Sequence, residues 1–338
     1  IGNYIADYSA MESHKTIMQY TGGDETKLNQ FMHDKSFQRW EDDWVVTPSV
    51  DFLYSKAWLD LREGAVMITP PQNPDGRYVS IMLTDTDHFD IGTQVNPGQT
   101  IMVVKKGSDY IAAKEAIVVE SETDFVFAFM RIVHKNDDPS IVHKMQASTN
   151  IVGKVGDAIP ESFTAEYSKE VETEALARID ESAKALTSSV DVFGTRKTLK
   201  NDLNRATGVM LGQWGLPADY VVYQSFFNGG VMYDGSVDHT MVIPAKVPMD
   251  SHWSVTVYND QKLLHGNEQR KHAHNSFYDY DRNQNASVTL TFSSDCGDRG
   301  VNCIETPKGK WYAVSRIYQP HQEVIVGEFT LNAPAISK

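Results

Sequence analysis

The sequence contains only two cysteines in 338 residues, no long apolar run and no excess of positive charge. No apolar segment approaches the roughly 20 residues that a membrane-spanning helix needs, so we expect no transmembrane segment. Lysine and arginine number 31 against 45 aspartates and glutamates, which gives a formal net charge of −14. Since phosphate binding requires clustered Lys and Arg, and no such cluster stands out, we expect no nucleic-acid partner.

Several catalytic motifs are also missing. The sequence has no Gly-x-Ser-x-Gly elbow, which argues against an α/β-hydrolase. It has no Walker loop and no Gly-x-Gly-x-x-Gly stretch, so nothing indicates a nucleotide or dinucleotide. No redox cofactor is signalled, and the sequence names no cofactor of any other kind.

The two cysteines, Cys296 and Cys303, flank a loop that contains two glycines. A disulfide across this loop is sterically allowed and would suit an exported protein, whereas two reduced thiols are the alternative. A zinc site with His272 and His274 is less favoured. The chain starts with Ile1 and not with methionine, which indicates trimming or a removed leader. We expect an exported protein, periplasmic or secreted.

Apolar periodicity predicts an order of helix, strands, helices and strands along the chain. Residues 3–37 have helical spacing, broken by Thr21-Gly22-Gly23, and short strands follow between residues 66 and 133, separated by Pro, Gly and Asn turns. Residues 138–216 are again helical in pattern. Further strands are predicted at the following segments: 221–223, 240–243, 253–258, 287–292, 311–318 and 323–326.

This order predicts a mainly β protein with a helical insertion, in which two antiparallel β-sandwich domains have a jelly-roll-like form. The predicted parts are residues 1–137 (N-terminal helix and first sandwich), 138–219 (helical insertion) and 220–338 (second sandwich). Since jelly rolls commonly build oligomers, we expect a homo-oligomer.

Two parts of the sequence resemble a known pair of domains. Residues 47–61, Thr-Pro-Ser-Val-Asp-Phe-Leu-Tyr-Ser-Lys-Ala-Trp-Leu-Asp-Leu, resemble the signature of the DUF1254 domain, and Gly76-Arg77-Tyr78 followed by Asp85 resembles its next strand. Residues 253–259 resemble the first strand of the DUF1214 domain, and residues 316–320 its closing strand. The resemblance implies two jelly-roll-type domains with a helical insertion, and it implies an export leader in many members; it assigns no activity.

The sequence departs from that pattern at three places. Ser49 stands where the family usually has Asn, and Phe52 where it has Thr. Residues 302–307 replace an Asn-Trp-Leu-Pro element of the second domain. A site that used those side chains would act on something different here, whereas simple drift in a loop is the neutral interpretation.

The first motif has two distinct faces when it is read as a strand. Asp51 begins a small, mostly apolar face, and Tyr54, Trp58 and Asp60 share the other face with Phe52 and Lys56. Aromatic rings alternating with charges would suit the wall of a ligand site. The alternative is structural: Asp51 caps the Thr-Pro turn and Tyr54 bonds the main chain.

Two further places carry candidate chemistry. Asp85, Asp87, His88 and Asp90 lie within six residues, which fits either a general base with a perturbed pKa or an exposed acidic loop. Arg316 shares one strand face with Tyr318, and a buried Arg is costly unless it is paired. It would bridge a carboxylate such as Asp51 or Asp60, or clamp the carboxylate of a substrate.

The resulting hypothesis is an enzyme that acts on a small polar substrate by acid–base chemistry, hydrolysis or elimination, where the two β-domains meet. We assign catalysis to Asp51, Tyr54, His88 and Arg316. We assign substrate binding to Trp58, Asp60, Tyr258 and Tyr318. The alternative is a non-catalytic protein that binds a small molecule or carbohydrate, or that serves in an oligomeric assembly. A metal enzyme using His265, His272 and His274 ranks below both, so no metal ligand is assigned.

Overall fold

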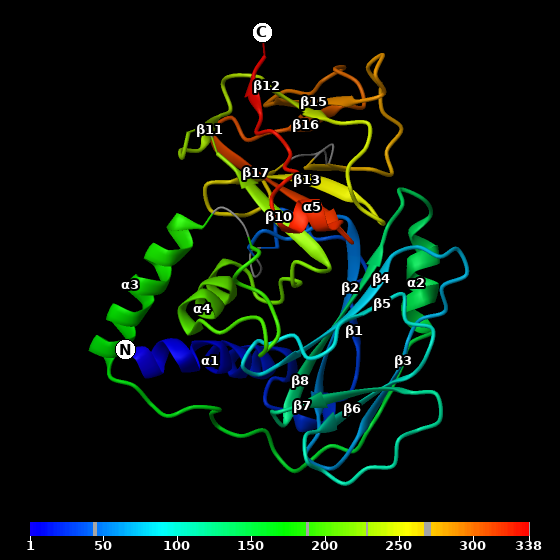
Figure 1. The fold of residues 1–338 in the computed structure, drawn as a ribbon, viewed down its shortest axis with the longest axis vertical. Coiled ribbons are helices and arrows are strands. Elements are labelled where there is room, and N and C mark those ends of the chain that lie inside the picture. Colours follow the sequence, from blue (N-terminus) through cyan, green and yellow to red (C-terminus); the bar gives the residue numbers. More distant parts are fainter. Residues whose placement is uncertain (43–45, 187–188, 228, 267–271, 338) are drawn as a thin grey trace. The chain divides into compact units, whose positions relative to one another are not determined.

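The computed structural model describes residues 1–42, 46–186, 189–227, 229–266 and 272–337 (Figure 1). Contacts divide the chain into two compact units, each built from separate stretches of sequence. Unit 1 consists of Ile1–Ser36, Phe52–Leu186 and Asp191–Leu216. Unit 2 consists of Phe37–Asp51, Thr187–Val190 and Pro217–Lys338.

Unit 1 contains two sheets. The five-stranded sheet has the order β1 (Met32–His33), β2 (Phe52–Asp60), β8 (Phe125–Val133), β4 (Val79–Asp85) and β5 (Gln94–Val95), and all its pairs are antiparallel. The four-stranded sheet has the order β7 (Ile117–Ser121), β6 (Ile101–Lys105), β3 (Val66–Thr69) and β9 (Asn150–Val152). Within this sheet, the described β3–β6 and β3–β9 pairs are antiparallel and the β6–β7 pair is parallel.

The long central strands of unit 1 are buried along their whole length, because both faces of the sheet are covered. Side chains on directly opposite residues share a face. Tyr54 and Ser80 flank Arg131, and Trp58 and Thr84 flank Phe127. We call this side the aromatic face; it carries Tyr54, Lys56, Trp58, Ser80, Met82, Thr84, Phe127, Phe129 and Arg131.

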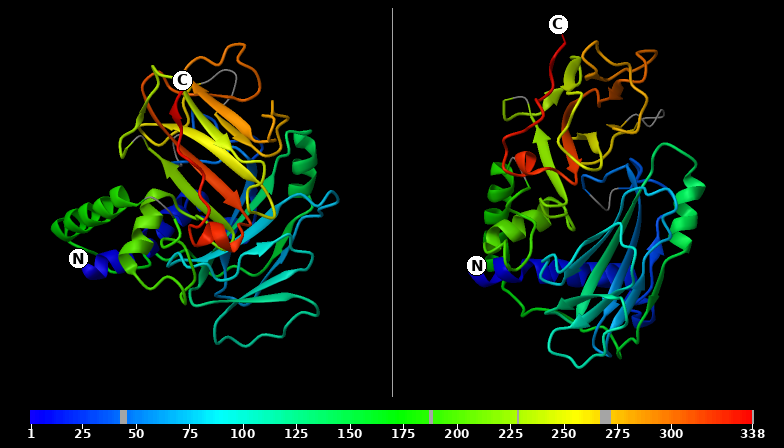
Figure 2. Two further views of the ribbon diagram at one scale, coloured as in Figure 1. Left: turned by 45° about the horizontal axis from the view of Figure 1, so that its top comes forward. Right: turned by 45° about the vertical axis from the view of Figure 1, so that its right-hand side comes forward.

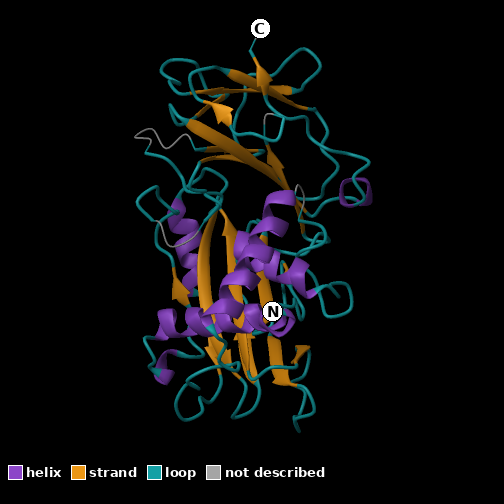
Figure 3. Ribbon diagram, turned by 90° about the vertical axis from the view of Figure 1, so that its left-hand side faces the viewer, coloured by secondary structure: helices purple, strands orange, loops and turns teal. Residues whose placement is uncertain are grey.

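Helices pack within unit 1. The described helices are α1 (Gly2–Thr21), the short 3-10 helix η1 (Glu25–Lys27), α2 (Pro139–Ala147), α3 (Lys169–Ala185) and α4 (Asp202–Leu211). Three of them share an apolar core around Tyr4, Ala175 and Val209, and Figure 3 shows helices lying across the long strands. The N-terminal helix ends where Gly22 adopts a left-handed conformation, φ 64°, which a glycine tolerates without strain.

Unit 2 is a second pair of sheets, visible in both views of Figure 2. One sheet has the order β10 (Val221–Phe226), β17 (Lys310–Tyr318), β13 (Trp253–Asn259) and β14 (Ala273–Asn275), and β11 (Tyr233–Asp234) also pairs with β17. The other has the order β16 (Cys303–Glu305), β15 (Val288–Ser293), β12 (His239–Ile243) and β18 (Ala335–Ile336). One apolar core joins both sheets, with Trp253, Leu290 and Trp311 among its members. The predicted mainly β, antiparallel sandwich class is confirmed.

Some boundaries differ from the prediction. Within the helical pattern expected over residues 3–37, the helix ends at Thr21, at the expected break, and the residues after Gly23 form only the short helix η1 and the two-residue strand β1. Residues 323–326, expected as a strand, belong largely to the short helix α5 (Gln322–Ile325), because only Val324 in that turn is buried and no alternating face exists. The segment expected as a separate helical insertion, residues 138–219, belongs mostly to unit 1. It also contains the strand β9.

Cys296 and Cys303 form a disulfide, which leaves no free cysteine in the chain. Of the two alternatives open at the level of sequence, the structure therefore has the bridge. None of the described helices is both long enough and apolar enough to cross a bilayer.

Candidate functional site

Residues 47–51, the first part of the Thr-Pro motif, are held inside unit 2 by side chains from its sheet. Arg316 Nη2 donates to the Thr47 carbonyl at 2.9 Å, and the Tyr258 hydroxyl donates to the Pro48 carbonyl at 2.7 Å. Asn275 Nδ2 donates to Asp51 Oδ1 at 2.8 Å. We call residues 47–51 the tether, because the chain enters β2 of unit 1 directly after it.

Asp51 is a buried carboxylate, 2% exposed, at the end of the tether. Its second oxygen accepts a hydrogen bond from Ser49 Oγ at 2.9 Å, so both oxygens have neutral donors. Burial lowers the pKa of nearby His252 to about 4, and the negative charge of Asp51 only partly opposes that shift. The imidazole of His252, stacked on Tyr318 at 4.3 Å, is therefore neutral at neutral pH.

Arg316 is 4% exposed, and its guanidinium donates hydrogen bonds to oxygen atoms of uncharged groups. In addition to its bond to the Thr47 carbonyl, Arg316 donates to Tyr258 Oη at 2.8 Å and to Thr256 Oγ1 at 3.2 Å. Burial disfavours its charge, but Tyr258 and Tyr318 outweigh that effect and raise the pKa of Arg316. The predicted ion pair between Arg316 and Asp51 does not form in the described structure; both side chains instead hold the tether.

The structure places the remaining predicted residues in unit 1. Tyr54 and Trp58 pack on the aromatic face against Phe129 and Phe127, with ring centroids 4.9 and 5.1 Å apart. Asp60 binds the Arg62 guanidinium through both oxygens and also accepts from main-chain N–H groups. Burial alone would raise the pKa of Asp60, but these bonds outweigh it and lower the pKa. Asp60 is thus engaged within its own unit.

The acidic segment after β4 is buried in part and is not an exposed loop. Asp85 and Asp87 both bind the guanidinium of Arg196, at 2.5 and 2.7 Å. Burial raises the pKa of Asp85 to about 6, although the charge of Arg196 opposes the shift. No local pattern indicates Arg196, which lies 111 residues after Asp85 and reaches the segment only through the fold.

His88 is enclosed in unit 1 and neutral at neutral pH. Burial, and then the positive charge of Arg205, lower the pKa of His88 to about 3. Its ring stacks on Trp214 at 5.9 Å, and its main chain has a left-handed φ of 64°. The role assigned to His88 as an acid–base partner stays a prediction, and this environment does not favour the imidazolium.

The described residues contain no group of three or more His, Cys, Asp or Glu side chains arranged to hold a metal ion. The rings of His265 and His272 meet edge to face at 5.3 Å, and His274 Nε2 lies 3.0 Å from the Cys303 carbonyl. The polar and charged residues 268–271, between His265 and His272, lie outside the described residues, as do Trp44 and Val45 before the tether.

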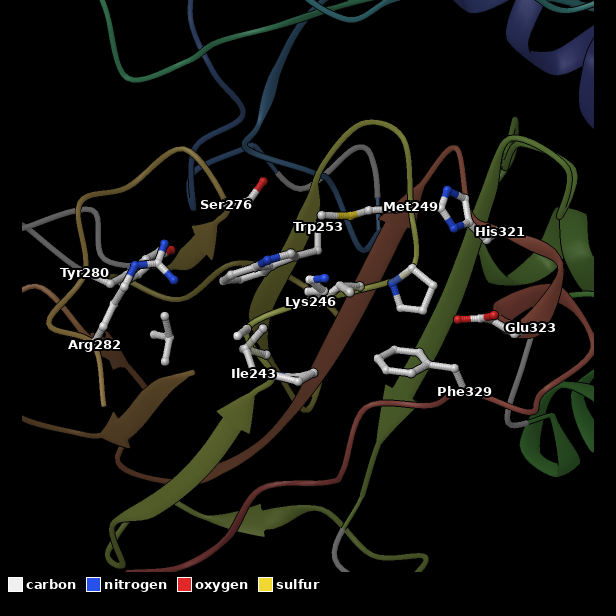
Figure 4. Close-up of a pocket in the computed structure, with 15 residues that line it drawn as sticks. Ile243, Lys246, Met249, Trp253, Ser276, Tyr280, Arg282, His321, Glu323 and Phe329 are labelled. Carbon is white, nitrogen blue, oxygen red and sulfur yellow. The ribbon is translucent and has the colours of Figure 1, made fainter. Parts of the chain in front are cut away.

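A pocket of about 660 Å³ opens at one end of the unit 2 sandwich (Figure 4). It lies where β12 ends and β13 begins, so its apolar wall is an extension of the core. Ile243, Met249, Trp253 and Phe329 form this wall. Trp253 stacks on Tyr280, with centroids 5.9 Å apart. Aromatic and aliphatic walls of this kind are typical of small-molecule sites.

Polar and charged side chains surround this apolar wall. Lys246 and Arg282 are exposed, and neither forms an ion pair with a described residue; Arg282 Nη1 donates only to the Ala286 carbonyl. His321 Nε2 lies 2.8 Å from Asp250 Oδ1, and Glu323 stands nearby on α5 (Figure 4). The pocket therefore presents an apolar surface beside two cations without counter-ions among the described residues.

The pocket wall is connected to the tether through hydrogen bonds. The Tyr280 hydroxyl donates to the Asn275 carbonyl, and the side chain of Asn275 donates to Asp51. No predicted site residue lines the pocket itself. The predicted strand 253–258 contains Trp253, but periodicity cannot show that this strand meets Arg282 at one opening.

Comparison with known proteins identifies both halves of the chain. Residues 28–153 match the family model described as "Protein of unknown function (DUF1254)", and residues 223–322 match that of DUF1214, described in the same words. The chain belongs to the two-domain DUF1254/DUF1214 family. No curated protein matches it.

Two solved structures share the fold of this DUF1254/DUF1214 protein. The VPA0106 protein from Vibrio parahaemolyticus has a TM-score of 0.79 and 21% identity, covering 100% of this chain and 98% of its own. A putative uncharacterized protein from Burkholderia cenocepacia has a TM-score of 0.55 and 12% identity, covering 99% and 88%. At these identities the likeness concerns the fold alone.

The family boundaries do not coincide with the compact units of this DUF1254/DUF1214 chain. The DUF1254 match includes the tether, which packs in unit 2 with Arg316 and Tyr258. The DUF1214 match contains most of the pocket, from Ile243 to His321, but stops before Glu323 and Phe329. Neither family match alone therefore contains the whole tether and the whole pocket of unit 2.

Proposed function

We propose that the protein binds a small organic anion with an apolar body in the pocket of unit 2. The observation that carries this proposal is the pairing of the Trp253 wall with Lys246 and Arg282, two cations without acidic partners among the described residues. In a chain of net charge −14, such cations offer an anion a local attraction that the rest of the surface opposes.

Calorimetric titration with hydrocinnamate, an aromatic carboxylate, tests the proposal. Its uncharged alcohol analogue is the ligand control. Replacing both Lys246 and Arg282 by Ala should weaken hydrocinnamate binding about five- to tenfold, since exposed charge pairs contribute about 1 kcal/mol or less. Salt should weaken it as well.

A matched variant separates the local effect from the change in net charge. Lys308 and Lys310 are exposed in the same unit and do not line the pocket. Replacing both by Ala should leave hydrocinnamate binding unchanged. Equal affinity for the acid and the alcohol in the wild type would reject an anion site, and a salt-independent affinity for sugars would favour a carbohydrate ligand instead.

Acid–base catalysis at the same pocket is the second candidate. The specific observation is the His321–Asp250 contact, because a carboxylate that orients an imidazole is a recurrent arrangement for a general base. A hydrolase or lyase of this kind would lose turnover in His321→Ala while still binding its substrate. Screening aromatic esters and hydroxy acids with both proteins tests this, and absence of turnover with every compound leaves binding as the function.

We further propose export and homo-oligomerisation. The Cys296–Cys303 disulfide supports export, since such bridges persist in oxidising compartments. Exposed apolar side chains on and beside the second sheet of unit 2, including Val242 and Ile336, support self-association. Sedimentation of wild type and Val242→Lys tests the latter: the variant should be monomeric if this surface is the interface.

A further inference from the structure

Arg131 is a buried cation for which the described part of unit 1 provides no acidic partner. It lies on the aromatic face in β8 and is 6% exposed. Its Nη2 donates to the Trp214 carbonyl at 2.6 Å, and its Nη1 approaches the Met82 sulfur at 3.7 Å. The other N–H groups of the guanidinium have no acceptor among the described residues. An Arg at this depth is normally paired with a carboxylate or phosphate.

Asp90 is the carboxylate whose charge acts on Arg131, but it does not bind the guanidinium. Its oxygens accept from the Gly92 and Thr93 N–H groups and from the Thr93 hydroxyl. Burial raises the pKa of Asp90 despite these bonds and the charge of Arg131. Asp90 is therefore committed to its own turn, and Arg131 keeps donors available.

The surroundings of Arg131 provide further donors and an aromatic platform. Ser80 lies directly opposite Arg131 on β4, and its hydroxyl is buried without a hydrogen-bond partner among the described residues. The indole N–H of Trp214 is likewise buried without an acceptor in the described structure. The guanidinium lies 4.2 Å from the centre of the Phe129 ring, which meets Trp214 edge to face.

Each of these groups has an N–H or O–H donor with no acceptor in the described part of the chain. An indole N–H and a guanidinium can only donate, so the ligand that satisfies them must bring the acceptors. A carboxylate offers two oxygens in the geometry of the guanidinium fork. We propose that the aromatic face carries a second ligand site, in which Arg131 and Ser80 bind the carboxylate of a small aromatic acid and Phe129 packs against its ring.

Arg131 also has a structural role that the test must separate from binding. Through the Trp214 carbonyl it fixes a loop in which Trp214 has a left-handed φ of 63°, an uncommon conformation for a bulky residue. Loss of Arg131 is thus expected to lower the melting temperature whether or not a ligand binds. Binding must be measured directly.

The experiment is calorimetric titration of benzoate into full-length protein that carries Lys246→Ala and Arg282→Ala, so that anion binding in the proposed pocket of unit 2 is weakened. Benzoate should bind this background and quench its tryptophan fluorescence, whereas benzyl alcohol should not. Adding Arg131→Met should weaken benzoate binding at least tenfold, and Arg131→Lys should weaken it less. Ser80→Ala, which removes one buried hydroxyl, should weaken it several-fold with little change in melting temperature.

Two outcomes overturn the proposal. One is absence of benzoate binding to the background protein at millimolar concentration. The other is unchanged affinity in folded Arg131→Met or, if that variant does not fold, in Ser80→Ala. The two tests are distinguishable, because hydrocinnamate binding that weakens when Lys246 and Arg282 are replaced supports the pocket in unit 2 even when benzoate does not bind at Arg131.

Discussion

At the scale of single residues, the partners of each buried arginine indicate its role. Arg77 binds the carboxylates of Asp75 and Asp137 and forms conventional structural ion pairs with them. Arg316 binds a carbonyl and two hydroxyls and holds the tether. Arg131 has one carbonyl, one sulfur and spare donors. The same residue type thus serves packing, positioning and proposed ligand binding, and the number of unsatisfied donors distinguishes them.

Arg316→Lys should destabilise unit 2. Lysine lacks the planar fork that reaches Thr47, Thr256 and Tyr258 together, so at least one buried hydrogen bond is lost, at a cost of about 1–3 kcal/mol. Urea unfolding measures the effect, with Arg282→Lys on the surface as the control. If Arg316 were a catalytic clamp only, the variant would lose turnover while keeping wild-type stability.

Asp85 should make the stability of the protein depend on pH in a defined direction. Burial raises its pKa to about 6 in the folded state, against 3.8 for an ordinary aspartate, although Arg196 opposes the shift. The folded protein therefore binds the proton more tightly, and this contribution to stability is present below pH 4 and lost as pH rises through 6. The stability advantage of wild type over Asp85→Asn should be largest near pH 4 and should shrink towards pH 7.

Urea unfolding of both proteins at several pH values between 4 and 7 checks this prediction. The Asn side chain keeps an oxygen for the N–H groups of Asp87 and Phe89, which lowers the risk of an unrelated collapse. A Glu120→Gln variant, at an exposed position on β7, serves as control. A difference that stays constant or grows with pH would show that Arg196, and not burial, dominates at Asp85.

At the scale of elements, alternation and turn residues predicted the strands well. Residues 253–258 alternate between apolar and polar side chains, and the observed strand β13, Trp253–Asn259, agrees with the prediction within one residue. The same reasoning failed at 323–326, where apolar residues adjoin Gly327 and form a helical turn. It also treated residues 47–61 as one motif, although the chain crosses from unit 2 to unit 1 after Asp51. Contacts such as Asp85–Arg196 and Asn275–Asp51 depend on tertiary packing that no local pattern encodes.

The disulfide should stabilise the end of the second sheet in unit 2. It joins the parallel strand β16 to the segment that follows β15, and it closes a short loop. For a loop of this length the entropy effect on the unfolded chain is about 2–3 kcal/mol. Cys296→Ser with Cys303→Ser should lower the stability by that amount, measured by urea unfolding.

Reductant provides the control for that measurement. It should destabilise the wild type but leave the double variant unchanged, because only the wild type has a bond to reduce. If neither reductant nor substitution changes unfolding, the bridge is not formed in the protein, and the support that it gives to export is removed.

At the scale of the whole molecule, sequence order and structural units are interleaved. The periodic pattern along the sequence predicts divisions after residues 137 and 219, whereas unit 2 also takes up Phe37–Asp51 from before the first long strand. The tether is fixed by Arg316, Tyr258 and Asn275, residues more than 200 positions away. A periodic pattern predicts which face of a strand is buried, but not which distant segment covers it.

This interleaving predicts that residues 217–338 do not form a complete unit by themselves. Expressed alone, this fragment should melt at a lower temperature than unit 2 does in the whole chain, because Arg316 and Asn275 lose their acceptors on the tether. A synthetic peptide of residues 37–51 should bind the fragment and raise its melting temperature. The same peptide with Asp51→Ala should bind at least about tenfold more weakly, since hydrogen bonds to a charged group contribute about 1.5–3 kcal/mol. A scrambled peptide is the control. If the fragment melts at the same temperature as unit 2 in the whole chain, and none of the three peptides changes that temperature, then the tether is not required for the stability of unit 2.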